Sequence, residues 1–275
     1  MQLLLFLALL LGLGPSYASE ASSQVAAIPP YSNEAALKLS EAVVGQEVGD
    51  YTLLDRQGQP FKISSYRGKP LLVSFIYTSC TEVCPATTQY LGKAVKYMQT
   101  ALGADSFAVL TVGFNAPWDS PMTMRDYARK QSVNLPNWEY ASADVETMKK
   151  FTRNLGFSYE YSVAGFNHIS MLTLIDKNGR IYRQVYGDNF ELPALGEPLK
   201  TLVGNVQTQY PGWEGISNKI RLFCTVYDPK TRTYTTDYSF FVGVSISIVM
   251  LYYFAAWLIR AWRNAPKRAP PESKK

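Results

Sequence analysis

Short continuous apolar runs along the chain alternate with longer stretches in which apolar residues recur at helical spacing. The most continuous runs lie at positions 70–77, 107–114, 169–175 and 181–186. A run of this kind is typical of a strand that is covered on both faces of a sheet. Helices, several of them opened by a capping residue or a proline, are expected over 34–43, 86–100, 121–131, 144–156 and 192–206.

Two hairpins and one further short strand complete this pattern. The first hairpin is expected over 51–63, with Gly58 at its turn, and the second over 169–186, with Gly179 at its turn. A short strand is expected at 138–140. Because strands and helices alternate, we predict an α/β fold with a mostly parallel sheet covered on both faces. The chain has 275 residues, 47% of them hydrophobic, which is enough for one well-filled domain with appendages.

The first residues have the pattern of an export signal. Positions 2–14 are nearly all Leu, Phe, Ala and Gly, and Ser16 and Ala18 supply small residues before a cleavage site. We predict a secretory signal peptide over 1–18. The alternative is an uncleaved anchor, for which this run is short.

A second long apolar run lies near the other end of the chain. Residues 239–262 carry no charge before Arg260 and are long enough to cross a bilayer, which needs roughly 20 residues. From Arg260 to the end there are six basic residues and one acid, Glu272, giving +5, which equals the net charge of the whole chain. The positive-inside rule therefore predicts a cytoplasmic tail and an exported domain on the other side of the membrane. A neutral exported domain excludes nucleic acid as a partner, and anionic lipid explains the basic tail better.

Two cysteines follow the central apolar run at a spacing that suits metal binding or redox chemistry. Cys80 and Cys84 lie where strand 70–77 turns into the next helix, whose positive end favours thiolate. Outside the inner membrane such a pair is a structural disulfide, a redox couple or a metal site. With three intervening residues inside a first helical turn, the two sulfurs are expected on one face, where they can converge on a metal. Thiolates prefer copper(I), zinc and iron–sulfur centres.

His168 is the only histidine of the chain. It precedes the apolar run 169–175, so it lies at a junction of loop and strand, as the cysteines do. In open α/β sheets, functional sites form at loops of this kind. The alternative is an ordinary hydrogen-bonded histidine, because chain position alone does not show that His168 and the cysteines share one edge of the sheet.

Several motifs in one order resemble a known family. They are Gly68-Lys69-Pro70, the run 75–78 leading to Cys80-x-x-x-Cys84-Pro85, Asp119-Ser120-Pro121, and His168 before Leu174-Ile175-Asp176-x-x-Gly179. Over residues 48–206 this pattern resembles the Sco (SenC/PrrC) proteins, which are copper chaperones for the binuclear copper site of cytochrome c oxidase. The resemblance implies a thioredoxin-like fold with an added hairpin, and it implies that Cys80, Cys84 and His168 are copper ligands.

With this resemblance the chain divides into six parts. They are a signal peptide (1–18), a linker (19–47), a thioredoxin-like copper-binding domain (48–208), a juxtamembrane connector containing Cys224 (209–238), a transmembrane helix (239–262) and a basic cytoplasmic tail (263–275). The expected protein is anchored in the inner membrane with its domain in the periplasm.

Three functions compete at this point. The first is a metallochaperone that delivers copper, as Cu(I) or Cu(II), to the copper-binding subunit of cytochrome c oxidase or to another periplasmic copper protein. The second is a thiol-disulfide oxidoreductase in which Cys80 and Cys84 reduce the cysteines of such a copper site. The third is a peroxidase with Cys84 as nucleophile, after the pattern Thr81-x-x-Cys84; no paired arginine motif supports it. A ligand role for His168 separates the first function from the second.

Overall fold

The computed structural model describes residues 31–133, 135–207, 225–228, 233–236 and 239–264. The predicted signal peptide, Cys224, most of the predicted connector and the end of the basic tail lie outside the described residues. All the elements below belong to one compact unit that begins at Ser32.

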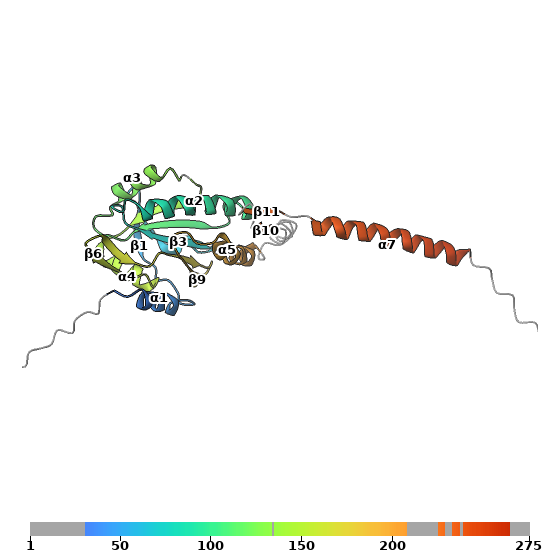
Figure 1. The fold of residues 1–275 in the computed structure, drawn as a ribbon, viewed down its shortest axis with the longest axis horizontal. Coiled ribbons are helices and arrows are strands. Elements are labelled where there is room, and N and C mark those ends of the chain that lie inside the picture. The colour runs from blue at the N-terminus through green and yellow to red at the C-terminus, as the bar shows by residue number, and fades with distance from the viewer. Residues whose placement is uncertain (1–30, 134, 208–224, 229–232, 237–238, 265–275) are drawn as a thin grey trace, which may run out of the picture. The chain divides into compact units, whose positions relative to one another are not determined.

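The elements follow the predicted order closely. The strands of the domain are β1 (Thr52–Asp55), β2 (Pro60–Lys62), β3 (Leu71–Ile76), β4 (Ala108–Gly113), β5 (Trp138–Ser142), β6 (Tyr159–Ser162), β7 (Gly165–His168), β8 (Met171–Ile175) and β9 (Ile181–Tyr186). Its helices are α1 (Asn33–Ala42), the 3₁₀ turn η1 (Ile63–Tyr66), α2 (Val83–Leu102), α3 (Pro121–Gln131), α4 (Val145–Asn154) and α5 (Leu192–Gln207). Figure 1 shows the helices packed around the sheet.

The main sheet has seven strands in the order β2-β1-β5-β4-β3-β8-β9. Only β3, β4 and β5 are joined in parallel; β2, β1, β8 and β9 enter through antiparallel pairs. The prediction of a mostly parallel sheet is therefore wrong. The physical reason is that only two connections, through α2 and α3, are helical crossovers between neighbouring strands, whereas hairpins supply the edges.

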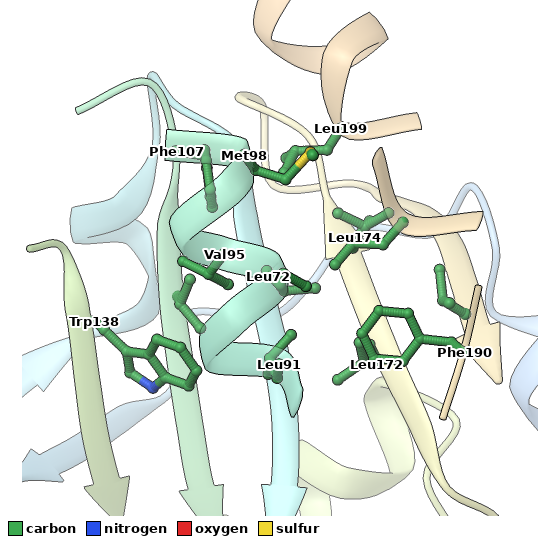
Figure 2. Packing of buried hydrophobic residues seen from close by; sticks show 14 of the residues in the cluster. Leu72, Leu91, Val95, Met98, Phe107, Trp138, Leu172, Leu174, Phe190 and Leu199 are labelled. Atoms are coloured by element: carbon green, nitrogen blue, oxygen red, sulfur yellow. The ribbon is translucent and has the colours of Figure 1, made fainter. Parts of the chain in front are cut away.

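Side chains of β3 alternate between two separate cores. Leu72 points to the face covered by α2 and α5 (Figure 2), and Ile76 belongs to the same core, which also includes residues of α3. Leu71, Val73 and Phe75 belong to the core on the opposite face, which α4 covers. This alternation follows from the two-residue period of a strand, and it explains why the whole run is apolar. The strand that leads to the cysteines is thus fixed from both sides.

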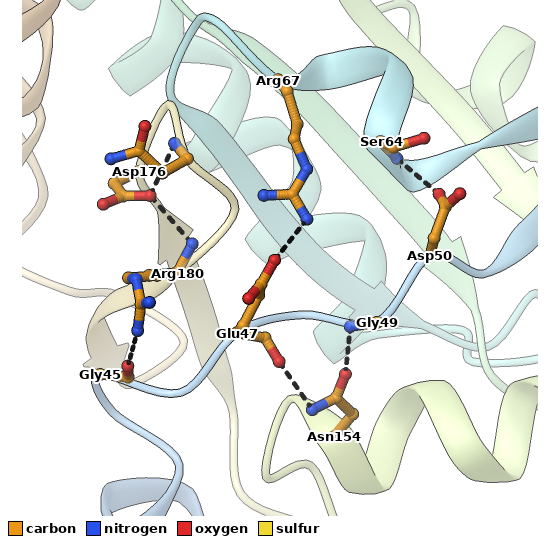
Figure 3. A network of polar contacts seen from close by, with 10 residues as sticks. Gly45, Glu47, Gly49, Asp50, Ser64, Arg67, Asn154, Asp176 and Arg180 are labelled. Atoms are coloured by element: carbon orange, nitrogen blue, oxygen red, sulfur yellow. Dashed lines mark hydrogen bonds and ion pairs between the residues drawn. The ribbon is translucent and has the colours of Figure 1, made fainter.

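Helix α1 packs on the domain and is fastened by polar contacts. Ser40 is fully buried, and its hydroxyl lies 2.8 Å from that of Tyr186 in β9. Beyond the helix, Glu47 pairs with Arg67 at 2.9 Å, and Asn154 accepts the amide of Gly49 at 2.8 Å (Figure 3). The boundary that we expected between the linker (19–47) and the domain (48–208) thus separates α1 from the core on which α1 packs.

Two hairpins were not expected from the sequence. β6 and β7 form a separate antiparallel pair in which Tyr159 lies opposite His168. Within the predicted connector, β10 (Thr225–Asp228) pairs with β11 (Thr233–Thr236). Both pairs consist of short, mixed polar and aromatic strands, which lack the apolar runs on which the prediction depended.

One described helix is long and apolar enough to cross a membrane. α7 (Ser239–Arg263; red in Figure 1) contains the candidate span Phe241–Arg263, none of which is buried against protein. A core helix of similar composition would bury one face. The helix coincides with the predicted transmembrane segment.

Candidate metal site

The cysteine pair lies between the end of β3 and the start of α2. Because α2 begins at Val83, Cys84 belongs to its first turn, whereas Cys80 lies in the preceding loop. Our expectation that both cysteines share the first helical turn is therefore wrong. They nevertheless meet, because the backbone N–H of Cys84 donates to the sulfur of Cys80 at 3.2 Å. Both thiols are free.

Cys80 is the more acidic thiol. Its partial burial opposes ionisation, but hydrogen bonds from the backbone amide and thiol of Cys84, the amide of Glu82 and the hydroxyl of Tyr77 outweigh this effect and lower the pKa of Cys80. Amides at the start of a helix stabilise negative charge. The preference for thiolate that we expected at this junction is thus confined to the first cysteine.

Cys84 has the opposite character. Its side chain is 5% exposed, and burial raises the pKa of the Cys84 thiol, assisted by its hydrogen bond to Cys80. The backbone N–H of Tyr77 donates to the same sulfur and opposes this shift. The Cys80 sulfur therefore ionises readily, whereas the Cys84 sulfur keeps its proton until a bound cation or oxidation to a disulfide replaces that proton.

A buried carboxylate holds the loop before Cys80. Asp119, 1% exposed, accepts the backbone N–H of Thr78 at 2.9 Å and the hydroxyl of Thr78 at 2.7 Å through one oxygen. Its other oxygen accepts the amide of Asn115 at 2.8 Å. Ser120, not Asp119, caps α3. Asp119 thus joins the segment after β3 to the segment after β4.

His168 reaches the same edge of the sheet as the cysteines. It ends β7 three residues before β8, and β8 runs antiparallel to β3 with Leu172 opposite Ser74. The beginning of β8 therefore lies beside the end of β3, where the cysteine loop starts. Like the cysteine pair, His168 thus lies at the edge of the sheet where β3 ends.

The imidazole is oriented by aromatic rings and by one hydrogen bond. Its centroid lies 5.6 Å from those of Phe114 and Phe157 and 6.5 Å from that of Tyr77. Nδ1 lies 3.2 Å from the carbonyl oxygen of Ile169. A carbonyl only accepts, so Nδ1 carries the proton and Nε2 has the free lone pair that a metal needs.

A cavity of about 30 Å³ lies between β3, α2 and the start of β8. Cys84 and His168 both line it, together with Ser170 and Thr87, and the buried hydroxyl of Thr87 has no hydrogen-bond partner among the described residues. This volume accommodates an ion or a water molecule. In the described part of the chain, however, no three His, Cys, Asp or Glu side chains converge closely enough to hold a metal.

The donor set fits copper. Two neighbouring thiols and an imidazole bordering the cavity of the second thiol are the ligands that copper and zinc prefer. The three donors do not converge in this structure, so the His168 strand must approach the cysteine loop before they can share one ion. Met122 and Met124 belong to no such set: Met124 is buried in the core and Met122 points to solvent.

Sequence reasoning missed two residues of this site. Asp119 or Ser120 was expected to cap the helix at Pro121, but this motif gave no indication of the contact of Asp119 with Thr78. Tyr77, whose backbone carbonyl accepts the N–H of Cys80 at 3.1 Å, was seen only as the end of a strand. Both roles depend on contacts between segments distant in the chain, which local spacing does not encode.

Comparison with known proteins identifies the family. The SCO1/SenC family model matches residues 41–203, more than half of the chain. A SCO2-like protein of Rickettsia prowazekii is 24% identical over 144 residues, covering 51% of this chain and 69% of that protein.

Two solved structures show the same architecture. A protein of Aquifex aeolicus assigned to electron transfer has a TM-score of 0.54 and 26% identity, and covers 58% of this chain and 94% of its own. BsSco, described as a member of the Sco family of cytochrome c oxidase assembly proteins with a disulfide switch, has a TM-score of 0.52 and 17% identity, and covers 57% and 95%. The predicted thioredoxin-like fold is confirmed, and the chain belongs to the SCO1/SenC family.

Proposed function

We propose that this protein binds one copper ion through Cys80, Cys84 and His168 and delivers it to a copper site of cytochrome c oxidase or of another periplasmic copper protein. The observation that carries the proposal is that the only histidine lies beside the thiol pair. The backbone N–H of Cys84 contacts the sulfur of Cys80, and the imidazole lines the same cavity as Cys84. BsSco is described as a member of the Sco family of cytochrome c oxidase assembly proteins, which supports the choice of recipient.

The unequal thiols give the order in which the ligands engage. Cys80 has the lowered pKa and is partly exposed, so it meets an incoming ion first. Cys84 is buried and protonated, so its ligation releases a proton to solvent. His168 then completes the set through Nε2, since Nδ1 is held by the Ile169 carbonyl. Release to a recipient reverses these steps, beginning with His168.

Because of helix α7, we assign copper delivery to the membrane surface. Its length and composition suit a membrane span, and two arginines occupy its last turn. The positive-inside rule then assigns the tail to the cytoplasm and the copper site to the periplasm. Tethering confines the domain to the surface at which a membrane-bound oxidase exposes its copper site.

A second function is favoured by the same two thiols. Cys80, as thiolate, attacks a disulfide in a partner protein, and Cys84 then attacks the mixed disulfide. The partner gains two thiols while this protein forms the Cys80–Cys84 disulfide, so electrons balance. The contact of Cys84 with the sulfur of Cys80 and the acidity of Cys80 suit this reaction. It makes no use of His168.

Copper titration of the reduced full-length protein in detergent separates the two functions. We expect one copper ion per chain, and we expect Cys80→Ser, Cys84→Ser and His168→Ala each to weaken binding by orders of magnitude against a competing chelator. Cys224→Ser is the matched control and is expected to bind as the wild type does. If His168→Ala keeps wild-type affinity, the three-ligand proposal fails. If the wild type holds no copper but reduces a model disulfide, the oxidoreductase function replaces it.

A further inference from the structure

Tyr77 contacts both the cysteine loop and the strand that carries His168. It is the first residue after β3. Its backbone carbonyl accepts the N–H of Cys80 at 3.1 Å, and its ring centroid lies 6.5 Å from that of His168. A single residue therefore links the cysteine loop to strand β7, which ends at His168.

The backbone of β7 lies against the Tyr77 hydroxyl. Gly165 has a φ of +119°, and a Cβ atom at that position would stand only 2.6 Å from the hydroxyl oxygen. A side chain there would therefore displace the hydroxyl or the strand. The Tyr77 ring also packs edge-on against Phe166 and Phe114, with centroids 5.1 and 5.5 Å apart.

His168 follows this contact by two residues of regular strand. Phe166 pairs with Tyr161, and His168 pairs with Tyr159, in the β6–β7 hairpin. A strand advances about 3.3 Å per residue, so the contact at Phe166 lies roughly 7 Å from the imidazole-bearing residue along a stiff element. A shift of Phe166 relative to Tyr77 therefore moves His168 relative to the sulfurs.

The hairpin has few other ties to the main sheet. β6 and β7 pair only with each other among the described strands. They are otherwise attached by the aromatic cluster formed with Phe114 and Phe157 and by the hydroxyl of Tyr159, which donates to the carbonyl oxygen of Phe114 at 3.4 Å. Ring packing tolerates sliding, whereas the close approach of the Tyr77 hydroxyl to the backbone at Gly165 limits it.

We infer that Tyr77 is a positioning residue whose hydroxyl holds the β6–β7 hairpin to the cysteine loop and so keeps His168 within reach of Cys80 and Cys84. This inference rests on the proposed three-ligand copper site. Without the hydroxyl, the two cysteines would still bind copper, but the imidazole would join them less often and leave sooner. The same contact would hold in the metal-free protein.

The test compares Tyr77→Phe and Gly165→Ala with Tyr161→Phe in the full-length protein. Tyr77→Phe removes the hydroxyl and keeps the ring; Gly165→Ala keeps the hydroxyl and pushes it from the strand, but it also places alanine at a φ of +119°, which strains the backbone by itself. Tyr161 lies on the same hairpin, but its side chain is 77% exposed, so its phenylalanine variant is the matched control. Tyr77→Phe is therefore the deciding variant, and Gly165→Ala supports the inference only when its effects are not additive with those of Tyr77→Phe in the double variant.

Two measurements are made on each variant. In the reduced, metal-free protein, amide hydrogen exchange over 165–168 should quicken several-fold in Tyr77→Phe and Gly165→Ala and stay unchanged in Tyr161→Phe. In the copper(II)-loaded protein, the nitrogen hyperfine signal of His168 should weaken and copper loss to a chelator should quicken about tenfold. Wild-type exchange and wild-type copper loss in both variants would overturn the inference.

The two proposals fail in different ways. If the wild type binds no copper, the proposed function is lost, whereas the exchange measurement still decides whether Tyr77 holds the hairpin. If the wild type binds copper through three ligands and both variants match it in exchange and in copper loss, only the role of Tyr77 is lost.

Discussion

At the scale of single residues, the two cysteines differ because one accepts helix-end amides and the other is buried. Burial resists the ionisation of Cys80, but hydrogen bonds from Cys84, Glu82 and Tyr77 reverse the balance and lower its pKa, whereas burial raises that of Cys84. A lower pKa means more thiolate at a given pH, and thiolate is the nucleophile.

This difference predicts selective alkylation of the reduced, copper-free protein. Near neutral pH, iodoacetamide should modify Cys80 well before Cys84, and the rate at Cys80 should rise with pH until its thiol is fully ionised. Peptide mass spectrometry over time measures both rates. Equal rates, or faster modification of Cys84, would contradict the assignment of the two thiols.

Asp119 predicts a stability effect. Asp119→Ala would leave the partly buried backbone N–H groups of Thr78 and Asn115 without acceptors, at roughly 1 to 3 kcal/mol each. We therefore expect urea titration to show a loss of about 2 to 6 kcal/mol in the free energy of unfolding. Asp126→Ala, on the exposed side of α3, is the control and should change it by less than about 1 kcal/mol. A small loss at Asp119 would show that water replaces the carboxylate.

Residue patterns predicted part of this picture. The cysteine spacing and the position after a buried run indicated a reactive pair, because those signals are local. The difference in thiol pKa between Cys80 and Cys84 could not be predicted, because it depends on where α2 begins. If α2 began one turn earlier, Cys80 would itself be helical. Asp119 and Tyr77 act across the fold and have no local signature.

At the scale of elements, the direction of β8 decides whether there is a site at all. The turn between β8 and β9 was predicted, and Asp176 stabilises it by accepting the amides of Asn178 and Arg180. In the mostly parallel sheet that we expected, the residue before β8 would lie at the edge opposite the end of β3. The antiparallel pairing of β8 with β3 brings His168 to the cysteines. Strand direction depends on long-range pairing, which alternation of apolar runs does not specify.

Removing side-chain volume from the core beneath α2 and α5 should lower the stability of the protein. Leu199 of α5 is fully buried among residues of β8 and α2 (Figure 2). Leu199→Ala should lower the free energy of unfolding by about 2 to 5 kcal/mol, because it removes buried methyl groups and leaves a cavity. Leu37→Ala on the exposed side of α1 is the matched control, with an expected loss of about 1 kcal/mol or less. Similar losses at both positions would contradict the packing of α5.

At the scale of the whole molecule, the apolar helix α7 predicts membrane attachment. All its described large apolar side chains beyond Phe241 are substantially exposed, which water disfavours and lipid does not. The full-length protein should stay in the membrane pellet after alkaline carbonate extraction, and a chain lacking 239–264 should be released. Retention of the shortened chain would show that another segment holds it.

The central claim is that the copper ion has two sulfur ligands and one nitrogen ligand from this chain. X-ray absorption at the copper edge of the copper(I)-loaded, full-length protein measures this set most directly. We predict two sulfurs and one imidazole nitrogen in the wild type, with the nitrogen lost in His168→Ala and one sulfur lost in Cys80→Ser. A wild-type shell of sulfur alone, unchanged by His168→Ala, would contradict the claim.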